Sequence, residues 1–172
     1  AQAVRLALAE RVQAVLLAGD VVDEANDRFE AYGALERGVR TLVEAGIGVM
    51  AVAGNHDHEA LPRLADLVGG MRLLGRGGHW ETGRVDGPGG PVHVVGWSFP
   101  GRVHAEDPAA AGLPPREADG ATVGLLHADL DAGRSPYAPT ATAHLRRAGY
   151  DAWLLGHVHR PTLAPGLGAI GY

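Results

Sequence analysis

The stretch VMAVAGNHD at residues 49–57 is the most informative part of this chain, because an apolar run ends there in a tight turn that carries polar side chains. Three other segments have the same layout of an apolar run followed by Gly, Asp or His. They are residues 15–23 (VLLAGDVVD), 123–127 (VGLLH) and 153–159 (WLLGHVH). Short apolar runs of this kind predict buried strands. Four predicted strands therefore each end in a side chain that can bind a metal ion.

The segments between these strands predict helices in the first part of the chain. Apolar positions near helical spacing indicate helices at 2–11 and 28–45 and a short one within 58–68. The second of these helices lies between predicted strands at 14–18 and 47–53. A strand, a helix and a parallel strand in this order are typical of an α/β fold whose sheet is covered by helices.

The rest of the chain predicts shorter elements. Strands are expected at 71–74, 78–85 and 92–97, and the glycine-rich turn at 87–90 joins the last two as an antiparallel pair. Residues rich in Pro, Gly, Ala and charge predict a long surface loop at 98–120. The later expected elements are a strand at 121–126, an irregular stretch at 129–139, a helix at 140–148, and strands at 151–155, 162–164 and 167–171.

Composition fits one globular domain. The chain has 172 residues, of which 46% are hydrophobic, and no apolar run approaches the roughly 20 residues of a membrane span. With no secretion signal either, we expect a cytoplasmic location and no membrane partner. The net charge of −5 argues against a chain that coats nucleic acid through a broad basic surface, but not against a nuclease whose bound metal ions add positive charge. Cysteine is absent, so His, Asn and carboxylate groups would have to hold any metal.

The order of elements also predicts a strand before the first helix. A helix at 2–11 that leads into a parallel strand at 14–18 should itself follow a strand, because parallel pairs need a crossover connection. The ending at Gly171-Tyr172 is similarly abrupt. We therefore expect residues 1–172 to form one domain that is truncated at both ends.

The polar ends of the four strands are expected to form one site. In α/β sheets ligands collect at the carboxyl ends of the strands, where the loops leave together. Each turn alone could be ordinary turn chemistry, since Asp and Asn favour turns beside Gly. Asp23 and Asp57 could equally cap the helices that follow them. The residues expected to meet are Asp20, Asn55, His56, His127, His157 and His159.

Taken together, GDVVD at 19–23, GNHD at 54–57, the lone His127 and GHVH at 156–159 resemble the calcineurin-like metallophosphoesterases. The resemblance implies a four-layer α/β/β/α sandwich with mixed sheets, whose first strand is missing from these residues. Four further stretches are similar to the bacterial DNA-repair exonuclease branch related to the SbcD nuclease subunit. They are SFP at 98–100, LLHADLD at 125–131, SPYAP at 135–139 and GYD at 149–151.

The resemblance also implies the metal ligands. Asp20 would bridge two divalent ions, with Mn as the first expectation and Mg, Fe or Zn as alternatives. Asn55, His127 and His157 would complete the shell of one ion, and His159 would bind the other. The family pattern expects an Asp-x-His pair before Asp20, and the chain has none. The second ion would therefore have only two ligands here.

The resemblance implies catalytic roles for the residues of the GNHD turn. A hydroxide shared by the two ions would attack the phosphate, and His56 would donate a proton to the leaving oxygen. Asp57 would orient His56, and Asp23 would hold a ligand or a loop from behind.

We therefore expect a metal-dependent phosphodiester hydrolase, and first of all a DNA-repair exonuclease. DNA would be its substrate, and the resemblance implies a coiled-coil ATPase partner and a homodimer. The alternative enzyme is a small-molecule or cyclic-nucleotide phosphodiesterase. An alternative of another class is an interaction scaffold that keeps the fold without catalysis. A protein phosphatase is disfavoured, because that branch has Arg-Gly where Glu24-Ala25 stand and Glu in place of Asp57.

Overall fold

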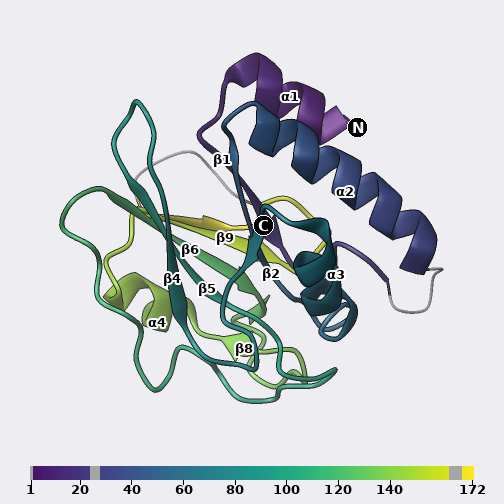
Figure 1. The fold of residues 1–172 in the computed structure, drawn as a ribbon. Coiled ribbons are helices and arrows are strands. Elements are labelled where there is room, and N and C mark those ends of the chain that lie inside the picture. The colour runs from purple at the N-terminus through teal and green to yellow at the C-terminus, as the bar shows by residue number, and fades with distance from the viewer. Residues whose placement is uncertain (1, 24–27, 163–167) are drawn as a thin grey trace.

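The computed structural model describes residues 2–23, 28–162 and 168–172, which form two β-sheets with helices on their outer faces (Figure 1). The first sheet has three parallel strands in the order β1, β2 and β3, at Ala14–Ala18, Gly48–Val52 and Met71–Leu73. Three helices pack on this sheet, α1 at Gln2–Glu10, α2 at Arg28–Glu44 and α3 at Ala60–Val68. The βαβ pattern predicted for the first third of the chain is confirmed.

The second sheet has five strands in the order β10, β9, β6, β5 and β4. Only β4 runs antiparallel to its neighbour, and the 87–90 turn between β4 and β5 is closed by a hydrogen bond from Gly90 N to Gly87 O (3.0 Å). Helix α4 (Thr142–Arg147) covers the outer face of this sheet. The strands are β4 at Glu81–Val85, β5 at Val92–Trp97, β6 at Ala121–His127, β9 at Ala152–Gly156 and β10 at Ala169–Gly171.

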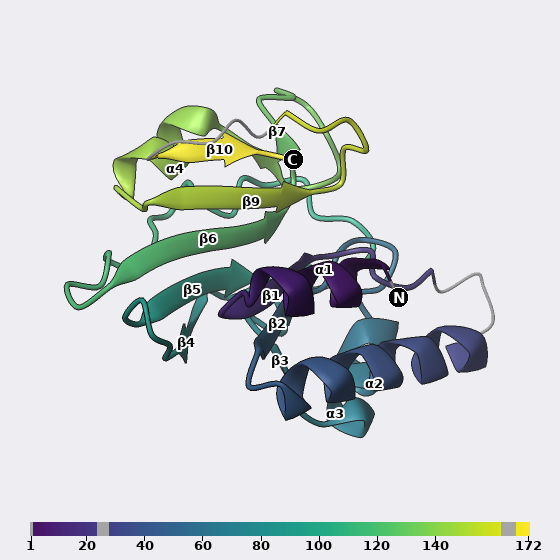
Figure 2. The ribbon, with the colours of Figure 1, turned by 90° about the horizontal axis from the view of Figure 1, so that it is seen from above.

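Side chains that alternate along β2 point into two different cores. In β2, Val49 and Ala51 face the helices, whereas Met50 and Val52 face the second sheet. Leu125 of β6 reaches the same inner core from the opposite side. The two sheets therefore pack face to face, with α2 and α3 outside one and α4 outside the other (Figure 2). This arrangement confirms the predicted α/β fold with four layers and mixed sheets.

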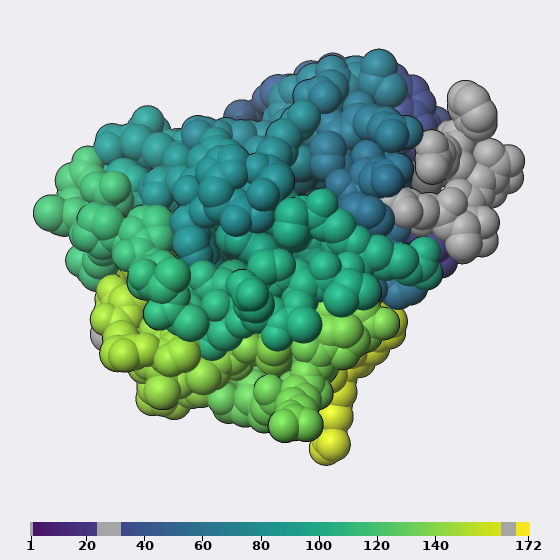
Figure 3. All heavy atoms as spheres, turned by 90° about the horizontal axis from the view of Figure 1, so that it is seen from below, coloured from purple at the N-terminus to yellow at the C-terminus, as the bar shows by residue number. Residues whose placement is uncertain are grey.

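The segment expected as a surface loop is partly core. Phe99 and Ala109 are almost fully buried, and Phe99 N donates to Ala53 O (3.0 Å). His104 forms a β-bridge with Tyr137, which ties the loop to residues 129–139. Figure 3 shows the loop as the green band between the teal and the yellow-green parts of one face. Buried apolar side chains, which the irregular sequence did not reveal, hold this segment in place.

The last third of the chain differs from expectation in smaller ways. The stretch 129–139 contains β7 (Asp129–Leu130), which pairs with β8 (Pro139–Thr140). The strand expected at 162–164 falls largely on residues 163–167, which lie outside the described residues. In the described part of the chain, no helix is both long enough and apolar enough to span a membrane.

Candidate metal centre

The polar ends of four strands meet where the two sheets face each other. Asp20 and Asn55 follow β1 and β2 of the first sheet, whereas His127 ends β6 and His157 follows β9 in the second. β1 runs parallel to β2, and β6 runs parallel to β9, so the carboxyl ends of each pair lie at one edge of its sheet. The ligand atoms of Asp20, His127 and His157 all lie within 4.8 Å of one another. The site therefore lies at a junction between the two sheets.

Glycine is required where the two sheets come closest. Gly19 and Asp20 both have left-handed backbone conformations, with φ of 82° and 51°. A Cβ atom at Gly19 would lie 2.5 Å from His127 Nδ1 and 2.8 Å from Gly54 N. Real side chains do not approach this closely, so only glycine fits there. The GD turn therefore brings the Asp20 carboxylate against the second sheet.

His127 is the buried centre of the site, with 1% of its surface exposed. Its Nδ1 lies 2.8 Å from the carbonyl oxygen of Ala18. Because a carbonyl only accepts, we assign the proton to Nδ1, which leaves a lone pair on Nε2. That lone pair faces Asn55 Oδ1 at 3.1 Å and Asp20 Oδ2 at 3.2 Å. Three electron-rich atoms converge, and either a second ring proton or a metal ion would satisfy them.

Asp20 is held in the ionised form that a metal ligand needs. Burial by itself raises the pKa of Asp20, whereas a second proton on His127 Nε2, which would donate to Asp20 and carry positive charge, lowers it. The backbone N–H of His56 adds to this effect by donating to Asp20 Oδ1 at 3.0 Å. The net result is a pKa below the usual value for an aspartate.

His157 is held in its neutral form. Burial lowers the pKa of His157, and the neighbouring His127 ring lowers it further. The two rings lie 5.2 Å apart between centroids, and the Tyr137 ring lies 5.0 Å from His157 on another side. A neutral imidazole is the form that binds metal ions.

We had expected Asp57 to orient His56, but its carboxylate binds backbone groups instead. Its carboxylate is fully buried and accepts hydrogen bonds from Gly54 N (2.7 Å), Val21 N (2.7 Å) and Val22 N (3.4 Å). Burial raises the pKa of Asp57 despite these three donors. The side chain therefore joins the turn after β2 to the turn after β1. Backbone donors from a distant turn leave no pattern in the sequence, which explains why the expectation was wrong.

Comparison with known proteins identifies the family of this chain. The family model described as calcineurin-like phosphoesterase matches residues 1–161. This chain belongs to that family. It is 31% identical over 163 residues to a Bacillus subtilis (strain 168) protein described as the uncharacterized metallophosphoesterase YhaO. That match covers 90% of the chain and 38% of the relative, so the chain spans well under half of the relative's length.

A solved crystal structure is similar in fold alone. It aligns with 99% of this chain and 83% of its own chain, with a TM-score of 0.52 and 11% sequence identity. The similarity supports the overall fold and says nothing about substrate.

Two expected residues of the phosphoesterase site lie outside the cluster. His56 is exposed, and its Nδ1 lies 3.9 Å from Asp23 Oδ1, so Asp23 rather than Asp57 is the carboxylate beside it. His159 is exposed two residues beyond His157 and is not in the group of ligand atoms around His127. Its expected role as a ligand of a second ion stays a prediction.

Sequence reasoning missed two contacts that hold His127 in place. One is the carbonyl oxygen of Ala18, because a main-chain acceptor has no signature in the sequence. The other is Phe99, whose ring packs edge-on against His127 at a centroid distance of 5.7 Å. Phe99 belongs to the SFP stretch at 98–100, so the family resemblance pointed to the segment but not to its role.

A second His and carboxylate group lies at the opposite end of the second sheet. The potential ligand atoms of His93, Glu117 and Asp119 are also within 4.8 Å of one another. Here, however, Asp119 already pairs with Arg84 Nη1 (2.7 Å) and His93 Nε2 (2.8 Å). An adjacent guanidinium supplies the positive charge that a metal would bring, and we interpret this group as a structural ion-pair network.

Proposed function

We propose that this phosphoesterase uses divalent ions to hydrolyse phosphodiester bonds in DNA, as an exonuclease of the SbcD-like branch. The observation that carries the proposal is the convergence of Asp20, Asn55, His127 and His157 from four strand ends. Support for the finer assignment comes from the stretches that resemble that branch. Two of them line the site, because Phe99 packs on His127 and Tyr137 on His157.

The donor set fits a divalent metal. It offers one carboxylate oxygen, one amide oxygen and two imidazole nitrogens, and this mixture suits Mn, Fe and Zn. Mg fits less well, because it prefers oxygen ligands. The lone pairs of Asn55 Oδ1 and Asp20 Oδ2 converge on His127 Nε2, and a bound cation would offset the repulsion between them. We propose Mn, in two ions that share Asp20, with His159 on the second. Divalent ions at such a site activate a water molecule and neutralise charge on the phosphate.

The residues of this chain would then position the substrate and move a proton. Asp57 holds the two turns in fixed relation, so Asp20 and Asn55 keep their geometry. His56 extends into solvent from the turn that carries Asn55, and its backbone N–H is fixed on Asp20. From there its ring can donate a proton to the leaving oxygen. Asp23 Oδ1 lies 3.9 Å from Nδ1 of this ring.

The partners of the whole protein are part of the same proposal. The relative that the chain matches is much longer, so further segments could carry contacts to a coiled-coil ATPase, to a second copy or to DNA.

The metal role is tested by Asp20→Ala, with the exposed Asp86→Asn as control. We expect Asp20→Ala to lose at least one bound ion in metal analysis by mass spectrometry and to lose hydrolysis, because it removes the ionised oxygen that faces His127. Asp86 pairs with Arg84 at the surface, so its variant should keep both. Retention of the wild-type metal content in Asp20→Ala would contradict the proposed ligand.

The substrate class is tested by assays with Mn on single- and double-stranded DNA and on an aryl phosphodiester. Release of nucleotides from DNA ends supports the exonuclease. Hydrolysis of the aryl ester alone would instead favour the small-molecule phosphodiesterase. Protein that binds no metal and cleaves neither substrate would favour the scaffold.

The proton donor is tested by His56→Ala, with the exposed His79→Ala as control. Loss of a general acid typically lowers turnover about 10²- to 10⁴-fold. We expect that loss in His56→Ala with the metal content unchanged, since the ring is outside the cluster around His127. Equal turnover in the two variants would remove His56 from the mechanism.

A further inference from the structure

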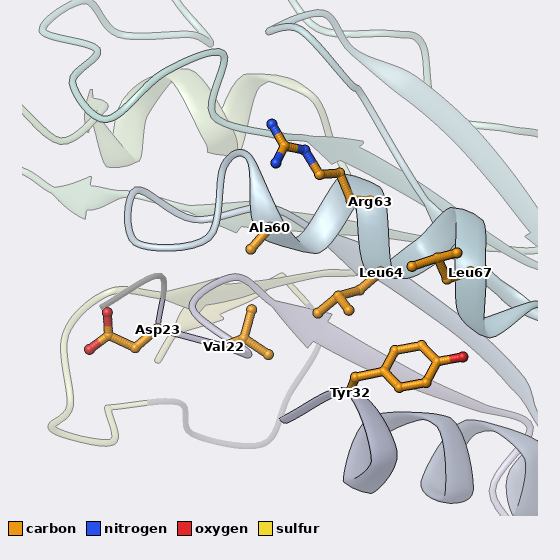
Figure 4. Close-up of a pocket in the computed structure, with 7 residues that line it drawn as sticks. All are labelled: Val22, Asp23, Tyr32, Ala60, Arg63, Leu64 and Leu67. Carbon is orange, nitrogen blue, oxygen red and sulfur yellow. The ribbon is translucent and has the colours of Figure 1, made fainter. Parts of the chain in front are cut away.

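A cavity of about 300 Å³ lies beside the metal centre, between the turn after β1 and helices α2 and α3 (Figure 4). Its volume is at the lower end of the range for small-molecule sites. In Figure 4 the side chains come from both sides of this space, with α3 on one side and the turn and α2 on the other. The lining residues are Val22, Asp23, Tyr32, Ala60, Arg63, Leu64 and Leu67.

The cavity and the metal centre share one rigid wall. Val22 and Asp23 follow Asp20 in the same turn, and the buried Asp57 carboxylate holds that turn through Val22 N. The other wall begins at Ala60, the first residue of α3, three positions after Asp57. A group bound in the cavity would therefore lie at a fixed distance from the metal ligands.

The chemistry of the lining fits an uncharged ring next to a phosphate. Val22, Ala60 and Leu64 are buried and aliphatic, and Tyr32 packs against the same cluster. Leu67 at the rim is 68% exposed, so its side chain is accessible to a ligand in the cavity.

One cation stands at the mouth of this cavity. The Arg63 side chain is 64% exposed, and its nearest ion-pair partner, Glu59, is at 3.5 Å. The guanidinium is accessible at the surface beside Glu59, and arginine is well suited to bind phosphate. An apolar slot with an aromatic ring and an arginine at its edge matches a nucleotide better than a purely aliphatic group.

We propose that this cavity is a subsite for a nucleobase of the substrate, adjacent to the phosphate that is cleaved. Tyr32 and Leu67 would contact the base, and Arg63 would contact a neighbouring phosphate. The inference rests on the proposed function, which it deepens by naming what the site recognises beside the phosphodiester. Contacts between bases and aromatic rings tolerate any base, so the subsite would bind DNA without sequence preference.

Two aryl esters test the subsite by hydrolysis in the presence of Mn. One is thymidine 5′-(4-nitrophenyl) phosphate and the other is methyl 4-nitrophenyl phosphate, which has no base. We expect a higher kcat/KM for the thymidine ester, and we expect Tyr32→Leu and Leu67→Gln each to lower the ratio of the two values. Loss of a base contact should lower that ratio about 5- to 100-fold.

Leu6→Gln is the matched control, because Leu6 is a similarly exposed leucine (61%) on α1, away from the cavity. It should leave the ratio unchanged. A ratio that is the same in the wild type, Tyr32→Leu and Leu67→Gln would overturn the subsite. A dimer in sedimentation that Leu67→Gln dissociates would also overturn it, since a second copy would then cover this surface.

Direct binding separates this inference from the proposed function. Calorimetric titration of thymidine 5′-monophosphate should give an affinity at least about 5-fold weaker in Tyr32→Leu than in the wild type. If neither ester nor DNA is hydrolysed, the proposed function fails, yet binding that depends on Tyr32 would still support the subsite. Equal affinities in the two proteins would overturn it.

Discussion

Replacement of Asp57 by asparagine distinguishes a structural carboxylate from a catalytic one. The change keeps the size of the side chain but turns one acceptor oxygen into a donor. Asp57 Oδ1 accepts from Gly54 N and Oδ2 from Val21 N, both at 2.7 Å. The single oxygen of an asparagine can accept from only one of these two backbone N–H groups. Its NH₂ group would then face the other N–H, which would lose its acceptor.

The magnitude follows from the burial of this group. A buried donor that loses its acceptor costs about 1–3 kcal/mol, and hydrogen bonds to a charged group contribute about 1.5–3 kcal/mol each. Part of this loss is offset. Burial of the charged carboxylate carries a desolvation cost, which raises the pKa of Asp57, and a neutral amide does not have this cost. We expect Asp57→Asn to lower the free energy of unfolding by about 2–4 kcal/mol, a large part of the stability of a typical domain.

Urea unfolding followed by tryptophan fluorescence measures this loss, and calorimetry with Mn measures the metal site in the same samples. The exposed Asp86→Asn is the control and should change the free energy of unfolding by less than about 1 kcal/mol, since Asp86 makes a surface ion pair with Arg84. We also expect weaker metal binding in Asp57→Asn. Wild-type stability and metal binding combined with lost turnover would refute this reasoning and restore a catalytic role for Asp57.

Two other substitutions test the fold around the site. Gly156→Ala should lower the free energy of unfolding by about 1–3 kcal/mol in urea, because its Cβ would overlap the carbonyl oxygen of Ala18, whereas Gly101→Ala has open space and should be neutral. Asp151 accepts a hydrogen bond from Thr122 N, which lowers the pKa of Asp151 in the folded state. The contribution of Asp151 to the free energy of unfolding is therefore present above the unfolded pKa and is lost as the pH falls through the folded value. The stability difference between the wild type and Asp151→Asn should therefore shrink as urea titrations move from pH 7 to pH 3, and a constant difference would contradict it.

Local patterns were enough to predict most of the elements. The strands predicted at 14–18 and 92–97 have the observed bounds of β1 and β5, because each is a short apolar run between polar or glycine-rich residues. The same runs do not reveal which strands share a sheet. A strand buried on both faces has the same composition in one wide sheet as in two stacked ones, so the α/β/β/α layering came from the family resemblance rather than from periodicity.

The sequence predicted which side chains of the candidate site lie together, but not the contacts that hold them in place. Asp20, Asn55, His127 and His157 meet as expected, because each directly follows or ends a strand and the carboxyl ends converge. The partners of Asp57 could not be predicted, because they are backbone donors whose direction depends on the turns around them.

The junction between the sheets has a consequence for how the protein matures. During synthesis, the segment with Asp20 leaves the ribosome long before the segment with His157, and neither sheet alone contains a full set of ligands. If these side chains hold an ion as proposed, the group would be complete only once β9 has paired with β6. By linkage, an ion present at 100 times its Kd adds about 2.7 kcal/mol of stability, and that energy would act on the docking of the two sheets. Metal binding would thus stabilise only the form in which both sheets have folded and packed together.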